Sequence, residues 1–183
     1  MSRLPAIDPA KLSADQRKVY DSIASGPRGG VRGPFLALIH VPDLCNRIQN
    51  LGEYLRYNTA YPPRLSEFAI IVTARHFNSQ YEWHAHAALA LKGGLAQAIV
   101  DAVREKRRPA GMQADETAVY DFVSELVMNN KVSDAAYKKV VDLFQVKGAV
   151  ELAGLTGYYI MIAMTLLAHE VPLPEGQAPY WKG

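Results

Sequence analysis

Hydrophobic and polar residues along most of the chain follow the period of α-helices. A clear example is a stripe of four apolar residues at spacings of four, three and four: Leu44, Ile48, Leu51 and Leu55. No segment shows convincing alternation of apolar and polar residues flanked by hairpin turns, and the spacing of βαβ units is absent. The pattern therefore predicts an all-α fold, a single-domain helical bundle of about seven or eight helices.

Capping residues and helix breakers set the expected limits of these helices. Ser13 and Gln16 form a capping-box pattern, Ser66 is the expected cap of the third helix, and Gly93-Gly94 closes the fourth. A loop rich in Gly and Pro is expected at residues 26–34, before an apolar run at residues 35–41. The expected helices span residues 13–25, 42–58, 67–77, 80–92, 96–106, 115–128, 133–144 and 149–167.

The longest apolar stretch, Leu152–Ala168, is interrupted by glycine, threonine and tyrosine. It falls short of the ~20 apolar residues that cross a bilayer, so we expect a buried core helix and no membrane association. The N-terminus shows no apolar run with a cleavage site, and secretion is not expected.

Composition narrows the functional classes further. The 183 residues are 49% hydrophobic and 21% charged, which favours a folded core, and the net charge of +2 argues against a nucleic-acid binder. The single cysteine, Cys45, excludes an intrachain disulfide, a Cys-x-x-Cys redox pair and a multi-thiolate zinc site. A cytoplasmic location is the natural expectation.

Groups capable of proton transfer are concentrated between residues 67 and 86. Glu82 and His86 are four residues apart and therefore share one face of a helix, where a carboxylate can orient an imidazole. Glu67 begins the preceding helix in an apolar neighbourhood. If it faces Glu82 and His86, two like charges near one imidazole would raise the pKa of one carboxylate, which suits a general acid or base.

Plainer interpretations of these residues remain open. A Glu-x-x-x-His pair is often a surface pair, and Glu67 alone suits the first turn of a helix. Cys45 is most simply a buried inert thiol. His84 lies roughly 160° around the helix from His86, which weakens a two-histidine metal site, and no metal or cofactor is expected.

The spacing of these residues resembles a known family. Glu67, eleven intervening residues, Ser79-Gln-Tyr-Glu82-Trp-His-Ala-His86 and then Gly94 are similar to the signature of the carboxymuconolactone decarboxylase and alkylhydroperoxidase D-like superfamily. In the peroxidase branch, cysteines stand where this chain has Ser79 and Glu82. In the decarboxylase branch the pattern is Glu-x-x-x-His followed eight residues later by Gly, which this chain keeps.

The resemblance extends over about residues 30–175 and points to a cysteine-free subgroup. It implies an alkylhydroperoxidase D-like helical fold, assembly as a homo-oligomer (trimer or hexamer), and an active site at or near a subunit interface. It also makes Glu67, Glu82 and His86 jointly credible as catalytic residues. Peroxiredoxin activity is associated with the superfamily, but thiol peroxide reduction needs a thiolate that neither motif position supplies.

The leading hypothesis is a cofactor-independent acid-base enzyme that decarboxylates a small organic acid or lactone, or performs a related proton transfer. His86 would shuttle the proton, Glu82 would orient it or act as partner base, and Glu67 would tune both. Candidate substrate-binding residues are Tyr81, Ser79, Arg32 and Arg75. The alternatives are a non-catalytic ligand-binding protein and a residual thiol peroxidase acting through Cys45.

Overall fold

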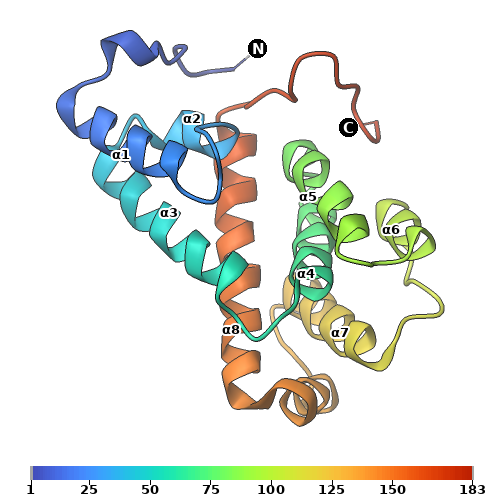
Figure 1. Ribbon diagram of the computed structural model, residues 1–183. Helices are drawn as coiled ribbons and strands as arrows, with labels where there is room; N and C mark the ends of the chain where they lie inside the picture. Colours follow the sequence, from blue (N-terminus) through green and yellow to red (C-terminus); the bar gives the residue numbers. More distant parts are fainter. Residues whose placement is uncertain (1, 183) are drawn as a thin grey trace.

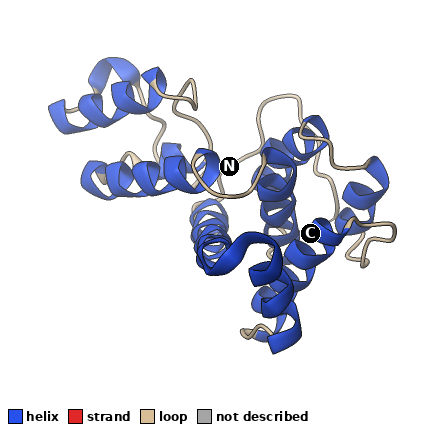
Figure 2. Cartoon of the chain, turned by 60° about the horizontal axis from the view of Figure 1, so that its bottom comes forward, coloured by secondary structure: helices blue, strands red, loops and turns tan. Residues whose placement is uncertain are grey.

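Helices make up all the regular structure in residues 2–182, the part of the chain that the computed structural model describes (Figure 2). In chain order the elements are a 3-10 turn at Pro9–Lys11, α1 (Ala14–Ser25), α2 (Pro34–Leu38), α3 (Pro42–Tyr57), α4 (Pro63–His76), α5 (Gln80–Lys92), α6 (Gln97–Arg104), α7 (Ala114–Asn129) and α8 (Asp134–Ala168). The all-α prediction is therefore confirmed.

The long helix α8 runs through the middle of the molecule, with α1–α3 on one side and α4–α7 on the other (Figure 1). Helix α4 packs against α5, α7 and α8. Its ten residues from Leu65 to Ala74 are all buried, which confirms the burial that the nearly continuous apolar sequence from Phe68 to Ala74 predicts. Burial on all sides fixes α4, and α5 packs along it, so side chains on these two helices are held on a rigid support.

The start of α4 differs from the sequence prediction. We expected Ser66 to cap a helix beginning at Glu67, but α4 begins at Pro63 and Pro62 occupies the cap position. Proline suits the first helical position because its fixed φ is already helical and its missing N–H would be unpaired there. Ser66 consequently lies inside the first turn. By contrast, the capping box of Ser13 and Gln16 is present at α1 as predicted.

Helix α8 joins the two segments that the sequence pattern separates at residues 133–144 and 149–167. The chain bends sharply within it at Gln145, whose φ of 61° lies in the left-handed region. By length and composition α8 could cross a membrane, but half of its most apolar window is buried. The predicted buried core helix is confirmed, because Leu152, Leu155 and Ile162 all lie in the core.

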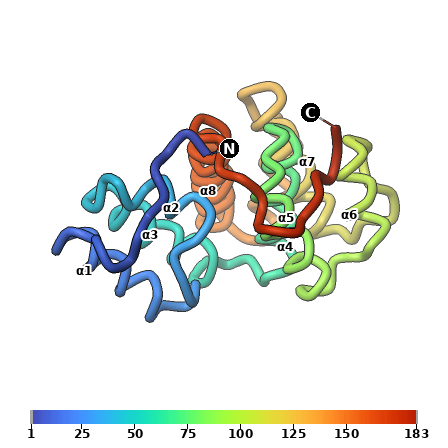
Figure 3. The backbone as a smooth tube through the Cα atoms, turned by 90° about the horizontal axis from the view of Figure 1, so that it is seen from above, coloured from blue at the N-terminus to red at the C-terminus, as the bar shows by residue number. Residues whose placement is uncertain are grey.

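The segment after α8 crosses the end of α5 at which that helix begins (Figures 1 and 3). The Gln80 side-chain amide holds this segment by two hydrogen bonds to its backbone. Nε2 donates to the Trp181 carbonyl oxygen at 2.8 Å, and Oε1 accepts from the Tyr180 N–H at 2.8 Å. The Trp181 ring also packs edge-on against Trp83, with centroids 5.5 Å apart. These contacts fix the beginning of α5, the helix that carries Glu82 and His86.

Candidate active site

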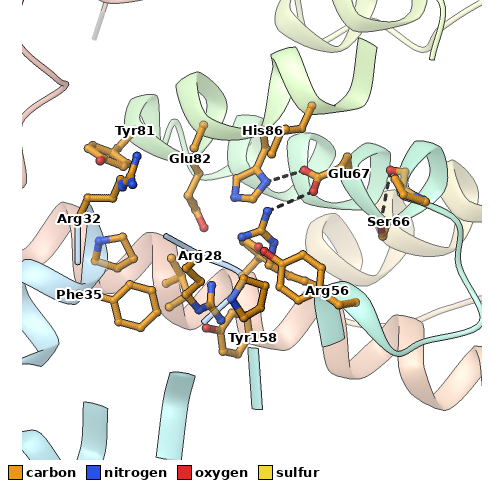
Figure 4. Close-up of a pocket in the computed structure, with 18 of the residues that line it drawn as sticks. Arg28, Arg32, Phe35, Arg56, Ser66, Glu67, Tyr81, Glu82, His86 and Tyr158 are labelled. Carbon is orange, nitrogen blue, oxygen red and sulfur yellow. Dashed lines mark hydrogen bonds and ion pairs between the residues drawn. The ribbon is translucent and has the colours of Figure 1, made fainter. Parts of the chain in front are cut away.

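A cavity of about 700 Å³ lies where the loop before α2 meets α3, α4, α5 and α8. Glu67 enters it from α4, and Glu82 and His86 enter it from α5 (Figure 4). The three residues that the motif predicts therefore share one cavity. Its volume falls within the range of ordinary small-molecule sites.

His86 is held by Glu67. The Nδ1 atom of His86 lies 2.5 Å from Oε2 of Glu67, and the Arg56 guanidinium lies 3.4 Å from the other carboxylate oxygen, Oε1. Burial would raise the pKa of Glu67, but the His86 and Arg56 side chains outweigh burial and lower it. Glu67 is therefore an anion that fixes the orientation of the imidazole.

The opposite ring nitrogen of His86, Nε2, has no hydrogen-bond partner among the described residues. The Tyr159 ring packs edge-on against the imidazole, with centroids 5.0 Å apart. Burial raises the pKa of Tyr159 well above its ordinary value, so this ring stays neutral. His86 is thus held at Nδ1 by Glu67 and packed against the Tyr159 ring, while its Nε2 forms no hydrogen bond within the described residues.

Glu82 is in a different environment. Its side chain points from α5 into the cavity (Figure 4), the residue is 2% exposed, and neither carboxylate oxygen has a partner within residues 2–182. Burial raises the pKa of Glu82 to about 8, against a smaller opposing effect of the nearby Ser79 hydroxyl. At neutral pH Glu82 is therefore mostly protonated and can donate a proton.

This geometry corrects two expectations. The partner of His86 is Glu67 and not Glu82, although Glu82 and His86 do share a helical face. The raised pKa of Glu82 comes from burial and not from repulsion by a second carboxylate. The two carboxyl groups have thus been separated into different states, one ionised and one protonated, by their surroundings.

Four cationic side chains line the same cavity: Arg28, Arg32, Arg56 and Lys92. Of these four cations, only Arg56 forms an ion pair with another described residue. Arg32 donates to the Gly29 carbonyl oxygen at 3.0 Å, and Arg28 donates to the Gln49 carbonyl oxygen at 3.2 Å. The cavity wall therefore carries more positive than negative charge.

Of the predicted substrate-binding residues, Tyr81 and Arg32 line the cavity. The Tyr81 ring rests on Gly33, whose φ is 58°, and a Cβ at Gly33 would stand 2.5 Å from that ring. Glycine is required there both for the left-handed backbone and for the close approach. Tyr81 thereby holds the loop that carries Arg28 and Arg32.

Ser79 and Arg75 are not brought into this cavity. Ser79 is buried at the beginning of α5 and faces a neighbouring groove beneath the C-terminal segment. Arg75 donates from Nε to the Arg104 carbonyl oxygen at 2.6 Å, and its guanidinium lies 4.2 Å from the centroid of the Trp181 ring. Arg75 therefore stabilises the C-terminal segment.

Arg28, Arg56, Tyr158 and Tyr159 also line the cavity, although sequence reasoning gave none of them a role at the site. Arg28 lies four residues before Arg32 in the Gly-rich loop, so the sequence could have indicated a place for it at the site. The same holds for Tyr158 and Tyr159, which belong to a segment that resembles the family. Arg56, at the end of α3, offered none.

His84 points away from His86, as helical geometry predicts. Its Nδ1 lies 2.7 Å from the Tyr180 hydroxyl, outside the cavity. Within the residues that the structure describes, no three His, Cys, Asp or Glu side chains are grouped so that they could hold a metal ion. The site consists of proton-transfer groups and cations.

No family model matches the sequence, and no curated protein matches it. Solved structures do match the fold. An uncharacterized peroxidase-related protein from Ralstonia eutropha JMP134 with an alkylhydroperoxidase AhpD core is 19% identical, with 97% of each chain covered and a TM-score of 0.75. An uncharacterized peroxidase-related protein from Silicibacter sp. TM1040 is 17% identical, with 98% of this chain and 96% of that chain covered and a TM-score of 0.71.

A third similar structure is a cysteine-to-alanine variant of the debrominase Bmp8 in complex with 2,3,4-tribromopyrrole. It is 12% identical, covers 96% of this chain and 95% of its own, and has a TM-score of 0.75. All three identities are low, so these likenesses concern the fold. The chain has the alkylhydroperoxidase D-like fold that its motif spacing implies.

Proposed function

We propose that the protein is a cofactor-independent acid-base enzyme that decarboxylates a small organic acid or performs a closely related proton transfer. The observation that carries this proposal is the separation of the two carboxyl groups. Burial raises the pKa of Glu82, which has no hydrogen-bond partner among the described residues, while His86 and Arg56 lower the pKa of Glu67. A protonated acid and an oriented imidazole in one cavity are the parts that general acid-base catalysis requires.

In a decarboxylation, the bond between the substrate carboxylate and its neighbouring carbon breaks and CO₂ leaves. The electron pair remains on that carbon. Glu82 then donates its proton to the carbon, and a proton from solvent restores the acid, with His86 as the group that relays it through Nε2. Glu67 neither gives nor takes a proton in this scheme, because its role is to hold Nδ1 of His86.

The cations of the cavity support an acidic substrate. Arg28, Arg32 and Lys92 line it without an ion-pair partner among the described residues, so a negatively charged molecule would supply the missing charge. Of the three, Arg28 is partly buried, and a cation partly shielded from water would stabilise charge that develops on the substrate more strongly than a fully solvated one.

Two of the similar structures are described as a peroxidase-related protein and a debrominase, so peroxidase chemistry and debromination are alternatives to decarboxylation. Thiol-dependent chemistry is not supported for this chain. Cys45 lies in α3, is fully buried, and has its pKa raised by burial to about 11. It does not line the cavity, and Ser79 and Glu82 stand at the motif positions of the two cysteines.

The experiment that tests the proposal follows small β-keto acids and unsaturated lactone acids by NMR in D₂O. Decarboxylation with deuterium incorporation at the former carboxyl-bearing carbon is expected for the wild-type protein. Glu82→Gln and His86→Ala should lower turnover by about 100-fold or more, while their helical circular dichroism is preserved. Turnover at the wild-type rate in both variants would overturn the proposal, and saturable binding without product would favour the non-catalytic alternative.

A further inference from the structure

The unpaired cations of the cavity differ in how firmly they are held, and Arg28 is held most specifically. Its guanidinium lies 4.8 Å from the centroid of the Phe35 ring and donates to the Gln49 carbonyl oxygen at 3.2 Å. Its Nε atom is buried and has no hydrogen-bond partner among the described residues. A fixed guanidinium with an unused donor is unusual, because leaving a buried donor unpaired costs free energy.

The space that Arg28 occupies is made by a glycine. Gly52 of α3 is buried, and a Cβ placed on it would overlap the Tyr158 hydroxyl and stand 2.6 Å from Nη2 of Arg28. Any other residue at position 52 would push both side chains out of place. Arg28 is therefore accommodated beside Tyr158 (Figure 4), and no acidic side chain within residues 2–182 forms an ion pair with it.

The surrounding charges leave this position open to an anion. Both carboxylate oxygens of Glu67 are already paired, one with Arg56 and the other with His86. Glu82, across the cavity, has no hydrogen-bond partner in the part of the chain that the structure describes, and in its protonated form it adds no negative charge. An anion that entered the cavity would therefore meet the Arg28 guanidinium, which lines the cavity and has no ion-pair partner among the described residues.

We propose that Arg28 binds a carboxylate group of the substrate and so orients the reacting carbon toward Glu82. This inference rests on the proposed function and adds to it a specificity-determining residue and a substrate class: organic acids that keep a carboxylate bound at Arg28 during the reaction. The planar guanidinium matches the two oxygens of a carboxylate better than it matches a neutral amide.

The test compares benzoate with benzamide, which have similar shape but different charge, by isothermal titration calorimetry. The wild-type protein should bind benzoate at least tenfold more tightly than benzamide. Arg28→Met should weaken benzoate binding by about tenfold or more and leave benzamide binding unchanged, which is the effect expected for losing a charge-assisted hydrogen bond. Arg75→Met is the matched control, since Arg75 lies outside the cavity, and should bind as the wild type does.

Two further variants keep the test decisive if Arg28→Met is destabilised. Arg28→Lys keeps the charge without the planar fork and should bind benzoate with intermediate affinity. Gly52→Ala leaves Arg28 in the sequence but disturbs the space that its side chain occupies, and should also weaken benzoate binding. Undiminished binding of benzoate by Arg28→Met, or equal binding of benzoate and benzamide by the wild type, would overturn this inference.

Glu82→Gln separates this inference from the proposed function. Benzoate binding should survive in Glu82→Gln while turnover is lost. If Glu82→Gln retains turnover and Arg28→Met loses benzoate binding, then the acid-base proposal fails and the carboxylate site stands. If Glu82→Gln loses turnover and Arg28→Met binds benzoate normally, then the carboxylate site fails and the acid-base proposal stands.

Discussion

Glu67 on α4 and His86 on α5 are joined at 2.5 Å through one carboxylate oxygen and one ring nitrogen, and both side chains are buried. This contact ties the two central helices together at the cavity and determines which face of the imidazole a ligand meets. Glu82, one turn away from His86, has no hydrogen-bond partner within residues 2–182.

The protonation of Glu82 should be visible directly. Because burial raises its pKa to about 8, the infrared carbonyl band of a protonated carboxyl group should persist at neutral pH and disappear with a midpoint about 8. Glu82→Gln should remove that band. If Glu82 acts as the acid, turnover should fall as pH rises through the same midpoint. A wild-type spectrum without the band at pH 6 would contradict the assignment.

The same group should weaken the fold at high pH. The folded-state pKa of Glu82 lies above its ordinary value of 4.5, so its contribution to stability is present below pH 4.5 and lost as pH rises through about 8. Glu82→Gln should therefore have a higher free energy of unfolding than wild type at pH 9, by up to about 5 kcal/mol. Urea unfolding at pH 5 and pH 9 measures this difference, and Glu175→Gln, at an exposed position, should show none.

Glu67→Gln should destabilise the protein because it leaves the buried Arg56 charge without its carboxylate. We expect a loss of about 3–5 kcal/mol in the free energy of unfolding. The pKa of Glu67 is lowered, so its contribution holds above pH 4.5 and is lost as pH falls through the folded-state value. Glu105→Gln, which removes an exposed pair with Arg107, should cost about 1 kcal/mol or less. Equal effects of the two variants would argue against a structural pair at Glu67.

Peroxide consumption should not depend on the single cysteine. Cys45 is buried with its pKa raised to about 11, so almost no thiolate forms at neutral pH. With dithiothreitol as reductant, wild type and Cys45→Ser should both consume hydrogen peroxide at the background rate. Consumption by the wild type that is lost in Cys45→Ser would restore the thiol alternative.

The homo-oligomer that the family resemblance implies remains a prediction. Helix α3 exposes several large apolar side chains, including Leu44 at 47% and Leu51 at 50%. Light scattering should give the mass of a trimer or hexamer, and Leu51→Glu should shift it toward the monomer, because burying an unpaired carboxylate is costly. Met128→Glu, at an exposed position on α7, is the control that should keep the wild-type mass.

The fold was largely predictable because helical periodicity and capping are local properties. The capping box at Ser13, the buried α4 and the break after residue 144, where the chain bends at Gln145, are all local patterns. At the site, the motif spacing brought Glu67, Glu82 and His86 to one cavity. Spacing could not reveal that α3 contributes Arg56, since that contact depends on how α3 meets α4 in space.

Arg75 and Arg28 show that distance from the motif in sequence does not predict which residues line the cavity. Arg75 lies near the motif in sequence, yet it stacks on Trp181 outside the cavity. Arg28 lies far from the motif in sequence, yet it lines the cavity because Tyr81 packs on Gly33 and holds the loop in place. Proximity in sequence identifies residues on one helix, whereas the wall of a cavity is assembled from several.

The side chains that line the cavity include no sulfur atom among the described residues. A site built on cysteines is inactivated when its thiols are oxidised and needs a reducing partner to recover. Carboxyl, imidazole and guanidinium groups do not undergo that chemistry. Oxidation of thiols, which inactivates a dithiol enzyme, would therefore leave the groups that line this cavity unchanged. A change of pH would alter their protonation.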